Sequence, residues 1–144
     1  SNFFGAVFSR LGTPMLLTEF LLSWDISVTL ILLVIMALIF LLGWPLEWVP
    51  IVLIIVPILI PVLIKLDVNL VWFGILVAVN LQTAWLSPPV ALSAYFLKGV
   101  VPEWDLKDIY LGMMQFMVIQ VIGLILIFIF PQIALWLPTM IYGE

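Results

Sequence analysis

The chain contains no cysteine and no histidine among its 144 residues. Disulfides and thiol chemistry are therefore absent, as are zinc sites of the usual type and histidine-based catalytic triads. Charged residues are also scarce, at 8% against about 25% in soluble domains. Only four residues are basic, which argues against a nucleic-acid-binding protein.

Apolar residues are abundant instead. They make up 67% of the chain, where a soluble domain has about 45–50%. Seven tryptophans suit a chain that crosses membrane interfaces several times, because tryptophan is enriched there. The composition therefore predicts an all-α integral membrane protein.

Prolines and short polar breaks divide the chain into five parts. We expect residues 1–26 to form the end of a preceding helix and a short interfacial helix, and 27–66 a helical hairpin. Residues 70–99 are predicted to form a transmembrane helix broken by proline, followed by a loop at 100–108. Residues 109–144 read as the last transmembrane helix and an interfacial tail.

The hairpin is predicted from segment length. Residues 27–43 would span roughly 25 Å as a helix, which is short for a hydrocarbon core of about 30 Å. The second half contains three prolines, which should bend or loosen its helix. Both halves therefore fit a re-entrant hairpin with its tip, Gly43–Glu47, inside the membrane. The residue pattern alone favours an ordinary loop, in which Glu47 is hydrated at the interface.

Polar side chains interrupt the next apolar segment just before two consecutive prolines. These side chains are Asn80, Gln82, Thr83 and Ser87, and Pro88 follows them. A proline pair breaks an α-helix because it lacks backbone donors and clashes with the preceding turn, so residues 86–87 are expected to be extended. Freed backbone groups in a membrane need protein, water or an ion as partner, which suggests a binding site. A proline kink with hydroxyls bonded to their own helix is equally consistent.

The spacing of the polar residues separates two roles. Asn80, Thr83 and Ser87 are three and four residues apart, so on a helix they form one stripe, predicted to face the hairpin tip rather than lipid. Gln115 and Gln120 are five apart and lie about 140° from each other around a helix. We expect them to bond neighbouring helices rather than a ligand. No catalytic constellation is visible, so an enzyme is not expected.

In this order, the segments resemble the C-terminal part of the large membrane (permease) subunit of tripartite ATP-independent periplasmic (TRAP) transporters. The resemblance covers nearly the whole chain, and Asn-Leu-Gln-Thr and Ser-Pro-Pro are its most specific segments. It rests on residues 42–48, 55–61, 71–83, 86–89 and 130–132. This chain departs from the family in having Glu47 where Asp is frequent and Ala91 where Gly is usual.

The resemblance implies one of two inverted repeats of an elevator-type secondary transporter in the bacterial inner membrane. Na⁺ would be its coupling ion, with no other cofactor, and organic acids such as carboxylates its substrates. Its partners would be the remainder of the large subunit, a small membrane subunit and a periplasmic substrate-binding protein. The implied site comprises Gly43, Trp44, Glu47, Asn80, Gln82, Thr83, Ser87 and Pro88, with Na⁺ held through Gly43, Thr83 and Ser87.

A second class of function stays open at this point. A truncated, transporter-like accessory subunit could pack against lipid and the helices of a larger membrane complex, since one repeat cannot rock against an absent partner repeat. A membrane enzyme is the weakest alternative, because the chain lacks histidine, cysteine and any acid pair at membrane depth.

Overall fold

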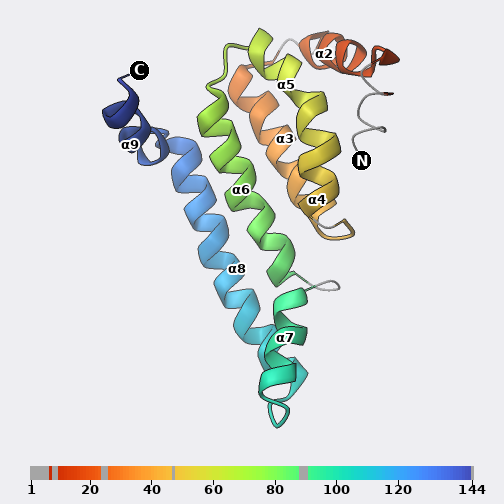
Figure 1. The fold of residues 1–144 in the computed structure, drawn as a ribbon, viewed down its shortest axis with the longest axis vertical. Coiled ribbons are helices and arrows are strands. Elements are labelled where there is room, and N and C mark those ends of the chain that lie inside the picture. The colour runs from red at the N-terminus through yellow and green to blue at the C-terminus, as the bar shows by residue number, and fades with distance from the viewer. Residues whose placement is uncertain (1–6, 8–9, 24–25, 47, 88–90, 144) are drawn as a thin grey trace.

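The computed structural model describes residues 7, 10–23, 26–46, 48–87 and 91–143. Within these ranges the regular secondary structure is entirely helical, as predicted (Figure 1). The expected end of a preceding helix falls mostly outside the described residues. The elements are α2 (Thr13–Ser23), α3 (Val28–Gly43), α4 (Trp48–Pro50), the π-helix η1 (Ile51–Ile55), α5 (Val56–Lys65), α6 (Leu70–Leu86), α7 (Leu92–Val100), α8 (Leu106–Ile129) and α9 (Gln132–Tyr142).

The predicted hairpin has α3 as its first arm and α4, η1 and α5 as its second (Figure 1). The Ser27 hydroxyl caps α3 by accepting the Leu30 N–H at 3.3 Å. The second arm loosens ahead of Pro57, where the Val56 N–H bonds to the Ile51 carbonyl five residues back. Proline cannot donate the usual backbone bond, and a π-turn is one way in which a helix absorbs such a defect.

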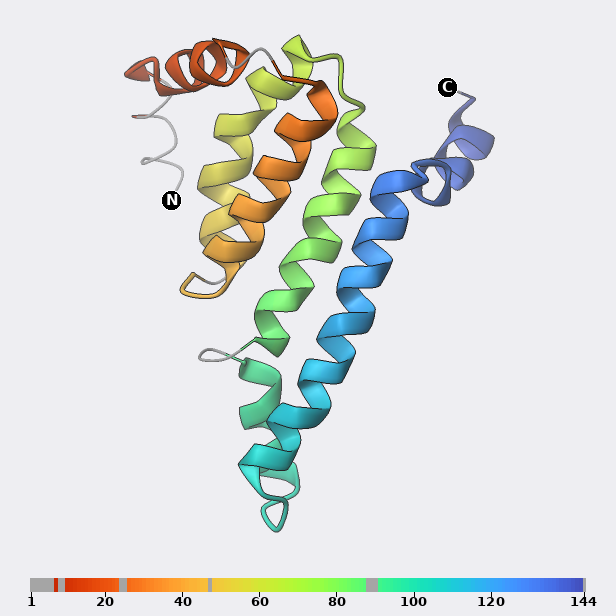
Figure 2. The same ribbon diagram turned by 180° about the vertical axis from the view of Figure 1, so that it is seen from behind.

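Helix α6 lies between the hairpin and α8 in both views (Figures 1 and 2). It begins at Asn69, whose Oδ1 accepts the backbone N–H groups of Val71 and Trp72 at 3.0 Å each. On its other side, the Trp72 indole donates to the Ile127 carbonyl of α8 at 2.9 Å. The apolar core is made by α3, the second arm and α6, and includes Ile31, Ile35, Ile39, Leu59, Leu63, Phe73 and Leu76.

Helix α8 is the longest element, with 24 residues, or about 36 Å at 1.5 Å per residue. It begins at Leu106, inside the predicted loop at 100–108, and Asp105 caps it by accepting the Lys107 N–H at 3.5 Å. It runs past both α6 and α7, whereas the hairpin lies beside α6 and ends before α7 (Figure 2). Helix α8 and the 48–65 arm are both long and apolar enough to cross a membrane.

The break predicted within residues 70–99 is present between α6, which ends at Leu86, and α7, which begins at Leu92, although 88–90 lie outside the described residues. Ser87 is extended, with φ −90° and ψ 132°, as expected before proline. Leu86 was also expected to be extended but ends α6, so the proline effect reaches one residue only. Ala91 is buried, with φ 20° and ψ 55°, a conformation that suits glycine better than a residue with a Cβ.

Candidate ion and substrate site

The three polar side chains of the predicted stripe are buried. Asn80, Thr83 and Ser87 are each 1% exposed, which confirms that they face protein rather than lipid. The Thr83 hydroxyl donates to the Asn80 carbonyl at 2.6 Å, and the Ser87 hydroxyl donates to the Thr83 carbonyl at 2.5 Å. Both bonds run along α6 itself, as in the proline-kink interpretation. A hydroxyl that donates still keeps two lone pairs, so both oxygens are able to accept a cation.

Asn80 lies farther from the hairpin tip than predicted. Its Nδ2 donates to the Met36 carbonyl at 2.8 Å, two turns before the end of α3, so it contacts the arm rather than the tip. Helices α3 and α6 run in the same direction (Figure 1), and only the C-terminal end of the stripe therefore reaches the tip. The Asn80 Oδ1 is buried with no hydrogen-bond partner among the described residues. An unpaired buried acceptor of this kind costs roughly 1–3 kcal/mol, so contact with a donor, a water molecule or a cation would be favourable here.

Gly43 brings the end of α3 against the last turns of α6. It is buried, and a Cβ built on it would lie 3.4 Å from the Ala84 Cβ. Trp44 turns outward instead: it is 39% exposed, and its ring stacks edge-on with Phe40 at a centroid distance of 5.8 Å. The structure thus brings Gly43 to the stripe and leaves Trp44 outside it. Glu47 and Pro88 of the predicted site lie outside the described residues.

Gln82 projects from a different side of α6 from the stripe. Its Oε1 accepts from Gln120 Nε2 of α8 at 2.6 Å, and the same nitrogen donates to the Val79 carbonyl at 3.1 Å. The prediction that Gln120 bonds a neighbouring helix is therefore confirmed. Gln115 is exposed and makes no such bond within the described part of the chain.

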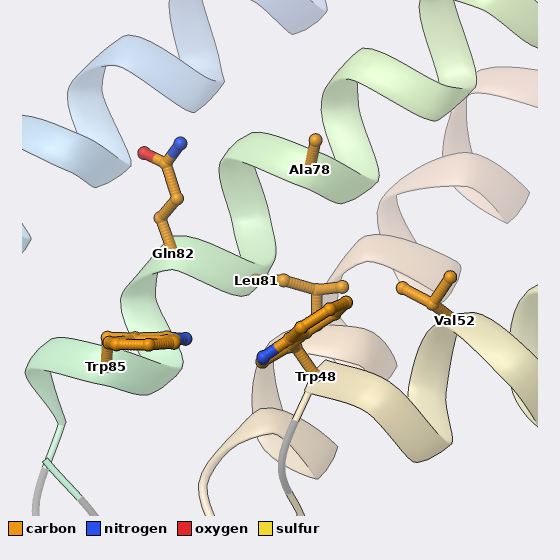
Figure 3. A pocket seen from close by; sticks show the side chains of 6 residues that line it. All are labelled: Trp48, Val52, Ala78, Leu81, Gln82 and Trp85. Atoms are coloured by element: carbon orange, nitrogen blue, oxygen red, sulfur yellow. The ribbon is translucent and has the colours of Figure 1, made fainter. Parts of the chain in front are cut away.

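Sequence reasoning missed two features of this region. The Met36 carbonyl is a backbone group inside an apolar run, and no sequence signal marks it. Trp48 and Trp85 line a cleft of about 340 Å³ between the start of the second arm and the end of α6 (Figure 3). A sequence signal exists for both, because Trp48 follows the predicted hairpin tip and Trp85 lies between Thr83 and Ser87.

The tip of the hairpin, the C-terminal end of the polar stripe and the helix break thus lie together at one end of α3 and α6. The model of the family described as "Tripartite ATP-independent periplasmic transporter, DctM component" matches residues 1–133. The chain belongs to this family. The resemblance inferred from the sequence is therefore confirmed, and the family is one of membrane transport proteins rather than enzymes.

Curated relatives share about a quarter of their residues with the chain. The sialic acid TRAP transporter permease protein SiaT of Haemophilus influenzae is 27% identical over 97% of the chain. The C4-dicarboxylate TRAP transporter large permease proteins DctM of Vibrio cholerae and Rhodobacter capsulatus are 25% and 28% identical over 90% and 96% of it. The chain spans only 23%, 28% and 31% of the length of these three relatives.

Proposed function

We propose that the chain is the C-terminal repeat of the large subunit of a Na⁺-driven transporter that imports organic acids. The observation that carries this proposal is the buried polar stripe beside the hairpin tip and the helix break, in a chain of this transporter family. Relatives are named for sialic acid and C4-dicarboxylates, which are all carboxylates. The repeat would act with the remainder of the large subunit, a small membrane subunit and a periplasmic binding protein, in the bacterial inner membrane.

Helix ends account for how a cation is held at this place. Helices α3 and α6 run in the same direction and end at Gly43 and Leu86. The C-terminal end of a helix carries a partial negative charge, so two such ends together favour a cation. The Thr83 and Ser87 hydroxyl oxygens and backbone carbonyls near Gly43 would supply the hard oxygen ligands that Na⁺ prefers.

The N-terminal ends of two neighbouring helices favour binding of an anionic substrate. The second arm and α7 both begin near this region, and no side chain among the described residues caps the first turn of α7. Uncapped N–H groups and the positive end of the helix dipole favour an anion. A carboxylate substrate would therefore lie on the far side of the tip from Na⁺, as in transporters that bind ligands between broken helices.

The hairpin tip is proposed to lie inside the membrane. The first arm has 16 residues and the second spans 18, or about 24 and 27 Å, against about 36 Å for α8. If α8 crosses the bilayer beside α6, the tip stops short of the opposite surface.

Cysteine labelling tests the depth of the tip. We expect a cysteine at Pro45 to react slowly with a membrane-impermeant maleimide in sealed vesicles, because the reagent has to enter the bilayer to reach it. A cysteine at Asn69, which is exposed at the start of α6, is the control for an accessible site. Equal labelling rates at the two positions would identify an ordinary exposed turn and contradict the re-entrant hairpin.

Uptake by the complete transporter in proteoliposomes tests the function and the role of Glu47. We expect carboxylate uptake with an inward Na⁺ gradient and none with K⁺.

Replacing Glu47 by Gln should lower the rate of uptake but leave the Na⁺ concentration at half-maximal uptake unchanged, since we assign Glu47 to stabilising the tip. A midpoint shifted by orders of magnitude would make Glu47 an ion ligand instead. No uptake in any gradient would favour the accessory-subunit function.

A further inference from the structure

One side of α6 is left open between the second arm of the hairpin and α8. Gly74, Ala78 and Gln82 are exposed there at intervals of four residues, so they share one face of the helix, called here the open face of α6. Figure 3 shows Ala78 and Gln82 with α8 on one side and Trp48 of the second arm on the other. The cleft of about 340 Å³ opens beside Ala78, and a Cβ added at Gly74 would meet nothing within 4 Å. The described part of the chain therefore leaves room along this face.

The edge of the open face carries two amides that are only partly hydrogen-bonded. Gln82 Oε1 accepts from Gln120 Nε2 at 2.6 Å, and the same nitrogen donates to the Val79 carbonyl at 3.1 Å. Gln82 Nε2 and Gln120 Oε1 have no hydrogen-bond partner among the described residues. The two amides meet where α6 contacts α8, beside the cleft rather than inside it. One donor and one acceptor are thus available to a neighbour that covers the open face.

Both amides lie deep in the membrane if α6 and α8 cross it side by side. Gln82 is 12 residues beyond the start of α6, and Gln120 is 14 residues beyond the start of α8, or about 18 and 21 Å at 1.5 Å per residue. The hydrocarbon core is about 30 Å thick, so these depths are near its middle. Lipid tails offer no hydrogen bonds there, and an unpaired amide is costly. The open face therefore favours a polar neighbour over lipid.

We propose that a transmembrane helix from the remainder of the large subunit docks on the open face of α6, with a polar side chain bonded to the free atoms of Gln82 and Gln120. The inference rests on the proposed function, in which the chain is one part of a longer subunit. The chain spans only 23%, 28% and 31% of the length of its three relatives, so most of such a subunit has to pack elsewhere. Small residues such as Gly74 and Ala78 allow two membrane helices to approach closely, and side-chain amides bond across them.

The residues around the open face distinguish it from another groove of the described chain. That groove lies between α3 and α8 and is lined by apolar residues alone, among them Leu33, Met36 and Leu124, so nothing in it favours a protein helix over lipid tails. A water-filled cavity would satisfy the amides of the open face. Its other lining is apolar, however, with Trp48, Val52 and Ala78 beside the cleft, and a helix covers such a surface better than water does.

Melting temperatures of the full-length large subunit in detergent test the docking of this helix. Ala78→Leu is expected to lower the melting temperature by about 2–6 °C, the effect of overpacking one covered position. Within the described chain a leucine at this position has room in the cleft, so the loss would come from the docked helix. Ala78→Ser keeps the residue small and is the matched control, which should melt like the unchanged protein.

A second variant, Gln82→Glu, separates three kinds of neighbour. It keeps an oxygen for Gln120 but replaces the free donor by a charged acceptor, so we expect it to lower the melting temperature as Ala78→Leu does. If only Gln82→Glu lowers it, the open face contacts lipid or detergent. If neither variant lowers it, the face lines a water-filled cavity. Either result would overturn the proposal. Melting is measured without substrate or an ion gradient, so a failure of Na⁺-driven uptake, which would contradict the proposed function, is a separate result.

Discussion

Replacing Asn80 by Asp is expected to destabilise the chain by about 3–5 kcal/mol, the cost of an uncompensated buried charge. Asn80 is 1% exposed and uses its Nδ2 to donate to the Met36 carbonyl. An aspartate would lose this donor and turn a negatively charged oxygen toward the carbonyl. The core side chains of α3 and α6 that the structure describes are apolar, so none of them carries a positive charge to offset it.

Asn69→Asp is the matched control for this change. Asn69 is exposed and caps α6 by accepting two backbone N–H groups, a role that Asp fills equally well. Unfolding in mixed micelles, in potassium buffer, should therefore separate the two variants by most of the expected 3–5 kcal/mol. Equal stabilities would show that Asn80 is not buried in a water-free interior and would contradict its placement between α3 and α6.

Replacing Gly43 by Leu is expected to push the hairpin tip away from α6. A Cβ at Gly43 would already lie in contact with the Ala84 Cβ, at 3.4 Å, so leucine atoms that extend further toward α6 would require a shift. Overpacking of this kind typically costs about 1–3 kcal/mol. Since the tip and the end of α6 together form the proposed cation site, Na⁺ binding should be lost as well.

Two further glycine variants separate crowding from a general effect of side-chain addition. Gly43→Ala places only a Cβ at ordinary contact distance and should keep most of the stability. A Cβ on Gly123 in α8 would meet nothing within 4 Å, so Gly123→Leu should be tolerated. Unfolding and Na⁺ binding of the three variants give the comparison. A Gly43→Leu variant with unchanged stability and binding would contradict the close approach of the tip to α6.

Much of this arrangement was predictable from local chemistry. The helical arms on either side of Gly43–Glu47 followed from the apolar runs and prolines, and the helix break followed from the proline pair, because these effects act within a few residues. The depth of the tip in the membrane stays a prediction. The burial of Asn80, Thr83 and Ser87 followed from their spacing on one helical face. The bond from Gln120 to another helix followed from the cost of an unpaired amide in a membrane.

Features that depend on how helices pack were not predictable from the sequence. The bond between Asn80 and the Met36 carbonyl needs the relative height of α3 and α6, which residue spacing within one helix does not determine. The bond between Gln82 and Gln120 needs the rotation of α8 about its axis. The conformation of Ala91 arises from the chain's path after the break, where the family's usual glycine was the only hint.

Thermal unfolding of the chain in detergent, in NaCl or in KCl at equal concentration, tests the proposed cation site most directly. A ligand that binds only the folded state raises stability, by about 1.4 kcal/mol at ten times its dissociation constant. We expect a higher melting temperature in Na⁺ than in K⁺ and loss of the difference in the Thr83→Val, Ser87→Ala double variant. Ser93→Ala in α7 should keep the difference. Equal melting temperatures in the two salts, or a difference that survives in the double variant, would contradict a Na⁺ site built from Thr83 and Ser87 at the hairpin tip.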